Sequence, residues 1–315
     1  MRNTMFALVF SAVSLSACAF TREGVWSFSE RSGNIAYDSS GKGRNASIDT
    51  NHVIRLGEAP GGGALWFESI AASARTNTAL VSVADFSSVA LSNGLSIAAW
   101  VWIDTHVSYS PIVMCTDDHE GWNGGFGLFT GEHGVLGCYV HSGIDENAVF
   151  GGKLMTNRWN HVAATFDGRY LKLWIDGKNV AGRMLAARDE TAVMTGAPLT
   201  FGTIGGGNGA IQPFVGAVAD VRVWSSALSA SSIADVYRLF LGEAVDPNSD
   251  DDEDGLSNGW EVRFKLDPRN SDDASSDMDG DGFSNLREYR LGRNPRVGRS
   301  KVSHSIIRSC TVVSP

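Results

Sequence analysis

The segment RWNHVAATFDGRYLKLWIDGKNVAG, residues 158–182, contains two apolar runs with a tight turn after the second. The pair Asp176-Gly177 is typical of a two-residue β-hairpin turn, since both residue types tolerate the left-handed backbone that such a turn needs. Side chains alternate along a strand, so one face of the first run carries Trp159, His161, Ala163 and Thr165. We expect His161 to be a core histidine rather than a catalyst. Because the apolar alternation of NHVAATF is incomplete, we also expect one face of this strand to lie near solvent.

The same sequence pattern extends from Phe20 to about Trp224, where short apolar runs are separated by Gly, Asn, Asp and Ser. The other runs include GGALWFES, ALVSVADF, LSIAAWVWI, PIVMC, FGLFT, GVLGCYVH, PLTFGTIGG and FVGAVADVRVW. Such spacing predicts an all-β sandwich. LSIAAWVWI is apolar at both odd and even positions and should be covered on both faces. A helical pattern first appears at residues 229–240, with Ser229 as its N-cap, and this helix should close the sandwich.

Four segments in order, residues 26–48, 94–104, 158–182 and 214–237, resemble the signature blocks of laminin-G-like, concanavalin A-like jelly-roll domains. The resemblance covers about residues 23–240. It implies two antiparallel sheets packed face to face, and glycans or proteins as ligands. It also implies a structural calcium near Asp38, helped by Asp220, although Ala219 stands where the family often has a second aspartate. The alternative is that Asp38 makes only an Asx-turn with its own backbone.

The acidic charge of the chain is concentrated in one segment. Residues 243–288 hold 15 of the 35 acidic groups and 4 of the 26 basic ones, so the charge of this segment is -11. The rest of the chain carries +2, and the net charge of the whole chain is -9. The main body therefore offers no electrostatic reason to expect a nucleic-acid partner. At 315 residues and 43% hydrophobic content, the chain is long enough for one large domain and a small one.

The acidic segment is a tandem repeat in which two DxDxDGxxxxxE loops follow each other. This pattern places carboxylates at loop positions 1, 3 and 5, a glycine at 6, a backbone carbonyl at 7 and a bidentate glutamate at 12, as calcium requires. We predict tandem calcium sites within residues 246–295, against the alternative of a solvated acidic linker. The expected ligands are Asp250, Asp252, Asp254, Leu256, Asn258 and Glu261 in the first loop, and Asp277, Asp279, Asp281, Phe283, Asn285 and Glu288 in the second.

The residues that flank the loops indicate the kind of calcium module. Asp246-Pro247 precedes the first loop and Asp267-Pro268 precedes the second, which argues against helices entering the loops, while the segments that leave both loops look helical. Without two helices that can swing apart, a calcium-sensor role is not expected. The segment resembles the thrombospondin type 3-like repeats of bacterial surface proteins, and more weakly a dockerin, although dockerin loops end in Asp rather than Glu.

The N-terminal residues 1–18 have the pattern of an export signal, with an apolar run too short to span a bilayer. The run ends in Leu-Ser-Ala-Cys18, which resembles the lipobox of bacterial lipoproteins and implies lipidation of Cys18 and anchoring in the outer membrane; ordinary cleavage is the alternative. In an oxidising compartment Cys115 and Cys138 could form a disulfide, or could remain buried thiols, with Cys310 left over in the basic, Ser-rich tail 296–315.

Catalytic signatures are weak in this sequence. GLSNG at residues 255–259 matches a nucleophile elbow only by accident, since a calcium loop surrounds it, and we find no paired-carboxylate strand motif of the laminarinase type. The loops TDDHEGWNGG and HSGIDEN are the expected ligand site, with Asp117, Asp118, His119, Trp122 and Asn123 as candidates. We therefore expect a non-enzymatic binding or adhesion module. A polysaccharide hydrolase or lyase on the same sandwich, and a calcium-stiffened structural spacer, are the alternatives.

Overall fold

The structure is a computed structural model that describes residues 21–57, 59–68, 79–84, 86, 89, 91, 94–116, 124–141, 146–185, 197–203, 214–241, 248–264 and 266–298. The chain divides into two compact units, Met1–Ala244 and Val245–Pro315. Their boundary falls close to the predicted one at residues 240–246.

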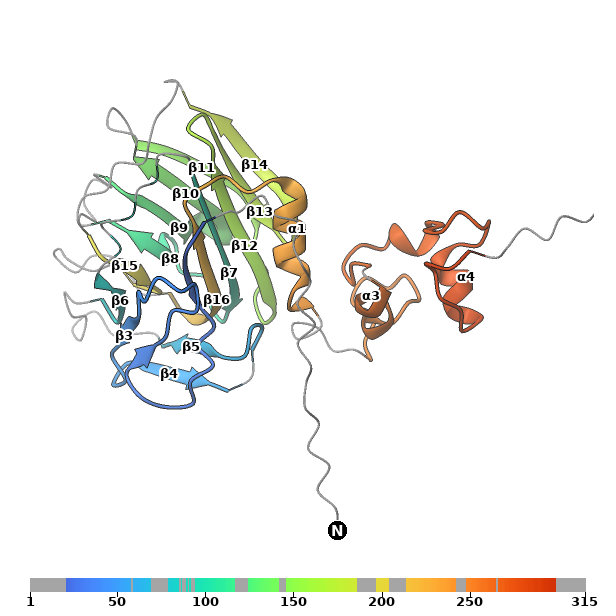
Figure 1. Ribbon diagram of the computed structural model, residues 1–315, viewed down its shortest axis with the longest axis horizontal. Coiled ribbons are helices and arrows are strands. Elements are labelled where there is room, and N and C mark those ends of the chain that lie inside the picture. Colours follow the sequence, from blue (N-terminus) through green and yellow to red (C-terminus); the bar gives the residue numbers. More distant parts are fainter. Residues whose placement is uncertain are drawn as a thin grey trace, which may run out of the picture. The chain divides into compact units, whose positions relative to one another are not determined.

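The first unit consists of two antiparallel sheets of eight strands each, which face each other in Figure 1. Sheet A has the order β14-β13-β12-β7-β16-β5-β4, and β1 also pairs with β16. Its strands are β1 (Arg22–Trp26), β4 (Val53–Leu56), β5 (Ala64–Phe67), β7 (Leu95–Ile103), β12 (Trp159–Phe166), β13 (Tyr170–Ile175), β14 (Lys178–Met184) and β16 (Gly216–Trp224).

Sheet B has the order β11-β10-β9-β8-β15-β6-β3-β2. Its strands are β2 (Ile35–Ala36), β3 (Ala46–Ile48), β6 (Val81–Val83), β8 (Ser110–Cys115), β9 (Phe126–Thr130), β10 (Val135–His141), β11 (Glu146–Lys153) and β15 (Leu199–Phe201). The all-β sandwich predicted from the apolar runs is confirmed.

The hairpin β13–β14 turns at Asp176-Gly177, as predicted. Both residues have left-handed backbones, with φ of 48° and 75°, and Ile175 pairs with Lys178. The Asp176 carboxylate accepts a hydrogen bond from the backbone N–H of His161 at 2.8 Å and pairs with Arg158. These contacts tie the turn to the neighbouring strand β12.

The central strand β7 of sheet A is buried on both faces. Ile97, Ala99 and Val101 of β7 enter the core between the sheets, whereas Ala98 packs on the opposite side. There helix α1 (Ala230–Arg238), capped by Ser229, covers the outer face of the sheet (Figure 1). Coverage of β7 on both faces and closure of the sandwich by this helix are confirmed.

The prediction that β12 has one face near solvent is wrong. All of its residues after Trp159 are buried, because α1 and the neighbouring Trp174 cover the face that carries Ala163 and His161. His161 contacts Trp100 and Tyr237, with ring centroids 5.3 and 5.7 Å away. Burial, together with the charge of Arg222, lowers the pKa of His161 to about 3. It is a core histidine, as expected.

Of the two alternatives for Cys115 and Cys138, the structure shows buried thiols rather than a disulfide. Cys115 lies on β8 and Cys138 on β10, and β9 runs between them. Two strand spacings of about 4.8 Å separate the backbones by roughly 10 Å, beyond the reach of a disulfide. Burial raises the pKa of the Cys138 thiol.

The second unit contains two acidic loops, each followed by a short helix: α3 (Asn258–Phe264) and α4 (Asn285–Arg290). A single 3₁₀ turn, η4 (Asp273–Ser275), precedes the second loop. Leu256, Leu266 and Ala274 form a small core, and the rings of Trp260 and Tyr289 meet at 5.2 Å. The predicted exit helices are confirmed, and within residues 248–298 no α-helix leads into either loop.

No helix in the described part of the chain has the length and apolar character that crossing a bilayer requires.

Candidate metal centres

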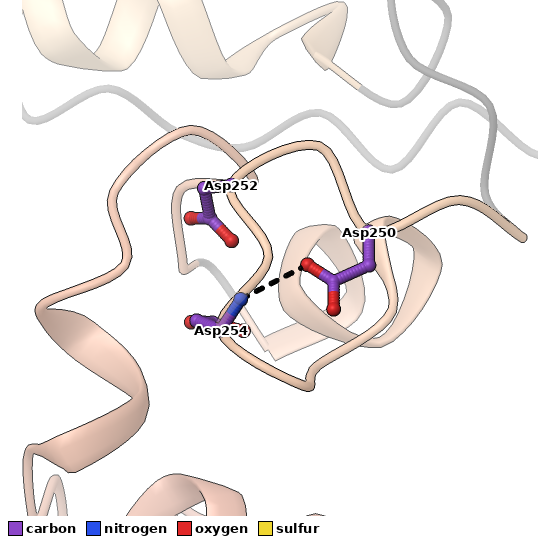
Figure 2. A group of neighbouring side chains, drawn as sticks. All are labelled: Asp250, Asp252 and Asp254. Atoms are coloured by element: carbon purple, nitrogen blue, oxygen red, sulfur yellow. Dashed lines mark hydrogen bonds between the residues drawn. The ribbon is translucent and has the colours of Figure 1, made fainter.

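The first acidic loop is curled by hydrogen bonds from its backbone to its own carboxylates. Asp250 accepts hydrogen bonds from the backbone N–H groups of Asp254 at 3.2 Å and Gly255 at 2.9 Å; Figure 2 shows the first of these. Asp254 accepts one from Leu256 at 2.7 Å. Gly255 has φ of 91°, which explains the glycine at loop position 6.

The second loop repeats this geometry 27 residues later. Asp277 accepts from Gly282 at 2.8 Å and Asp281 accepts from Phe283 at 3.0 Å, while Gly282 has φ of 93°. Position 4 is also left-handed in both loops, at Glu253 with φ of 61° and at Gly280 with φ of 74°. The sequence repeat is therefore a structural repeat.

The loops bring their carboxylates together into three groups. Within each group, one oxygen per residue lies within 4.8 Å of the others. The groups are Asp250, Asp252 and Asp254; Asp254, Glu261 and Asp273; and Asp277, Asp279 and Asp281. Figure 2 shows the three side chains of the first group close to one another.

The glutamate at position 12 of each loop is buried, with 0% exposure for Glu261 and 1% for Glu288. Neither carboxylate oxygen of Glu261 has a hydrogen-bond partner among the described residues, and the same holds for Oε2 of Glu288 and both oxygens of Asp252. A buried carboxylate without a partner is costly unless a cation or a proton neutralises it.

The raised pKa values of carboxyl groups in both loops reflect this cost. Burial raises the pKa of Glu261 to about 9, with further contributions from the charges of Asp252, Asp254 and Asp273. Burial and the neighbouring Asp254 raise the pKa of Asp252 to about 6. The pKa of Glu288 is raised by burial and then by Asp279, Asp281 and Asp277. Carboxylates that repel one another in this way match what a divalent cation with all-oxygen ligands requires.

The asparagines at position 9 are both fully buried but differ in their contacts. Asn258, whose role as a ligand stays a prediction, accepts a hydrogen bond from the backbone N–H of Asp251 and donates one to the Ser249 hydroxyl at 2.6 Å. Its carboxamide thus holds the start of the loop. Asn285 donates to the backbone carbonyl of Asp273, and its Oδ1 has no hydrogen-bond partner within the described residues.

Asp273 was missed by the sequence analysis, because it lies outside both loop motifs. It follows Glu261 by 12 residues and reaches the first loop through the fold of the intervening segment. One of its carboxylate oxygens, Oδ2, accepts a hydrogen bond from the backbone N–H of Asp267 at 3.0 Å.

The two aspartates expected to hold calcium in the sandwich are engaged by protein donors. Asp38 accepts hydrogen bonds from the N–H groups of Ser40, Val25 and Arg44 and from the Ser40 hydroxyl, which is the Asx-turn alternative. Asp220 is buried and forms a two-pronged pair with Arg222 at 2.8 and 3.0 Å. The guanidinium supplies the positive charge that a calcium ion would otherwise bring.

The predicted ligand-site residues Asp117, Asp118, His119, Trp122 and Asn123 lie outside the described residues, as do Cys18, Cys310 and most of the tail 296–315. The placement of these candidates therefore stays a prediction.

Comparison with known proteins identifies the sandwich. Residues 75–234 match the family described as the concanavalin A-like lectin/glucanases superfamily. The chain belongs to this superfamily. The match lies within the first unit and does not include the acidic repeats. A search of curated proteins found no match.

Solved structures with a similar fold are distant in sequence. One is domain 4 of AbnA, a GH43 extracellular arabinanase from Geobacillus stearothermophilus, in complex with arabinotriose, with 19% identity and a TM-score of 0.52, covering 69% of this chain and 98% of that one. Another is the binding domain of Paraclostridial Mosquitocidal Protein 1, with 13% identity and a TM-score of 0.53, covering 70% of this chain and 53% of that one. A third is the receptor-binding domain of botulinum neurotoxin type G, with 14% identity and a TM-score of 0.50, covering 70% and 51%. The superfamily member described here thus spans about half the length of either toxin domain.

Proposed function

We propose that this protein is a non-enzymatic, exported and lipid-anchored recognition module, whose jelly-roll binds a carbohydrate or protein ligand and whose C-terminal repeats bind calcium. The cell surface is the place where an exported protein with the lipobox-like Cys18 would present such a module.

Calcium binding is supported above all by the buried Glu261 carboxylate, which has no hydrogen-bond partner among the described residues and lies beside aspartate oxygens. Asp250, Asp252, Asp254 and Glu261 would hold one ion. Asp277, Asp279, Asp281 and Glu288 would hold the other. The backbone carbonyls of Leu256 and Phe283 occupy loop position 7, which supplies a backbone ligand in this type of loop.

Recognition rather than catalysis is supported by the fold and by the sandwich carboxylates. The solved structures named above include a domain in complex with arabinotriose and two toxin binding domains. In the described sandwich, Glu23, Glu30, Asp176 and Asp220 each form an ion pair with an arginine. Glycoside hydrolysis needs two carboxyl groups that flank the scissile bond, and these four carboxylates are each bound to an arginine instead.

The test is a panel of polysaccharides, with arabinan and arabino-oligosaccharides included, assayed for both retention and release of reducing ends. Retention without cleavage supports the proposal, whereas release of reducing ends would assign the sandwich to hydrolases or lyases. If the protein binds neither a polysaccharide of the panel nor a member of an array of extracellular proteins, the calcium-stiffened spacer is the better description. Running the panel with and without a chelator shows whether the repeats contribute to recognition.

A further inference from the structure

Asp273 lies between the two loop motifs, and its carboxylate reaches the first loop. An oxygen of Asp273 lies within 4.8 Å of oxygens from Asp254 and Glu261, and Asp254 also belongs to the group with Asp250 and Asp252. The first loop therefore has a fifth carboxylate that its own motif does not contain. This step builds on the calcium binding proposed above.

The buried Glu261 supports a cation among these carboxylates. Its side chain is 0% exposed, both oxygens have no hydrogen-bond partner among the residues that the structure describes, and one of them belongs to the group with Asp273. Asp273 brings another negative charge toward a buried, already crowded carboxylate. Such an approach is unfavourable without a positive ion between the groups.

The second loop holds Asp273 in place. The fully buried Asn285, at position 9 of the second loop, donates its side-chain N–H to the backbone carbonyl of Asp273 at 2.8 Å. The neighbouring Ala274 is buried in the small core with Leu256, which is position 7 of the first loop. The residue that completes the first loop is thus positioned by the second loop and by the core of the unit.

The two loops differ in the number of carboxylates that can reach them. At the repeat offset of 27 residues, the counterpart of Asp273 is Ser300, which has no carboxylate. The first loop has five candidate carboxylate ligands, and the second has four: Asp277, Asp279, Asp281 and Glu288. The affinity of such loops for calcium depends on the number of charged ligands and on rigidity.

We infer that Asp273 is a ligand of the first calcium ion, and that the first loop consequently binds calcium more tightly than the second. Asp273→Asn should weaken the tighter of two calcium-binding steps about tenfold or more and should leave the weaker step within about twofold. The substitution keeps an oxygen that can accept the hydrogen bond from Asp267. Asp272→Asn is the matched control, because Asp272 is exposed, adjacent and outside the carboxylate groups, and it should leave both steps unchanged.

The experiment is a calcium titration of the full chain by calorimetry, with the wild type, Asp273→Asn and Asp272→Asn side by side. If the wild type binds no calcium, the proposed function and this inference both fail. If the wild type binds two ions and Asp273→Asn behaves like Asp272→Asn, only the inference fails.

A second measurement does not depend on the folding of a variant. In the wild type, the ¹³C signal of the Asp273 carboxylate should shift with the first equivalent of calcium. A shift only with the second equivalent, or no shift at all, would overturn the inference.

Discussion

Glu261→Gln should have opposite effects on the second unit with and without calcium. Its carboxylate is buried, has no hydrogen-bond partner among the described residues and lies beside Asp254 and Asp273. A ligand that binds only the folded state at about 100 times its dissociation constant stabilises that state by about 2.7 kcal/mol per site. Loss of the closing ligand of one loop should remove roughly this amount and raise the fraction of open chain about 100-fold.

In a chelator the sign reverses. Without a cation, Glu261 must either stay charged or take up a proton when it is buried, and both cost free energy. Glutamine keeps the shape of the side chain and has no charge to neutralise, which should save about 1–3 kcal/mol. The metal-free variant should therefore be more stable than the metal-free wild type. A purely structural glutamate, one whose role does not involve a cation, would not produce this crossing.

Limited trypsin digestion measures the effect, because cleavage follows the population of the open form when opening and closing are fast. Arg263 and Arg287 are exposed positions next to the loops. In calcium, Glu261→Gln should be cut about 100-fold faster than the wild type at these sites; in chelator, it should be cut more slowly. Glu253→Gln is the control, since Glu253 is exposed in the same loop, and its rates should stay within about threefold of the wild type.

Two outcomes would refute the reasoning. One is equal cleavage of the wild type in calcium and in chelator, which would mean that metal binding contributes nothing to the folding of this unit. The other is equal behaviour of Glu261→Gln and Glu253→Gln under both conditions. The combined variant of Glu261→Gln and Glu288→Gln should reproduce chelation, while the sandwich stays folded in every case.

Three further predictions concern the first unit and the anchor. Cys18→Ser should move the protein from the membrane fraction into the soluble fraction on cell fractionation, and unchanged partitioning would contradict lipidation. Asp176→Ala should lower the free energy of unfolding of the sandwich by about 3 kcal/mol in denaturant titration, because it leaves the Arg158 charge and a strand N–H without their partner; Asp167→Ala, in an exposed turn, should cost less than about 1 kcal/mol. Alkylation of the unfolded, unreduced chain should modify Cys115 and Cys138 fully, whereas protection of both would restore the disulfide hypothesis.

Strands with regular burial were predictable from the sequence. The expected runs at β7 and β9 match the observed bounds, since both lie in sheet interiors, where apolar side chains dominate. The apolar runs did not indicate β2, and β14 was implied only by the hairpin turn before it; both strands lie at sheet edges. Most of β14 is exposed, so its sequence KNVAGRM carries no apolar alternation.

The errors in the first unit arise from contacts that join distant parts of the chain. The solvent-facing side expected for β12 is covered by α1, whose position on sheet A is not encoded in the sequence of β12. The choice between a disulfide and two buried thiols at Cys115 and Cys138 likewise depended on strand order, which places β9 between the two residues.

In the candidate metal centres, too, the residues of a single loop were predictable from the sequence, whereas a residue brought in by the fold was not. Asp250, Asp252 and Asp254 were predictable because the curl of a short loop fixes which alternate side chains turn inward. Asp273 was not, because its approach to Glu261 depends on how the chain returns after α3. That return is made by the packing of Leu256, Leu266 and Ala274, and Ala274 is the residue next to Asp273. The core of this unit and its first carboxylate site therefore form together. A cation that draws Asp273 toward Glu261 also favours burial of Ala274, so calcium binding at the first loop and packing of this small core should occur as one cooperative transition.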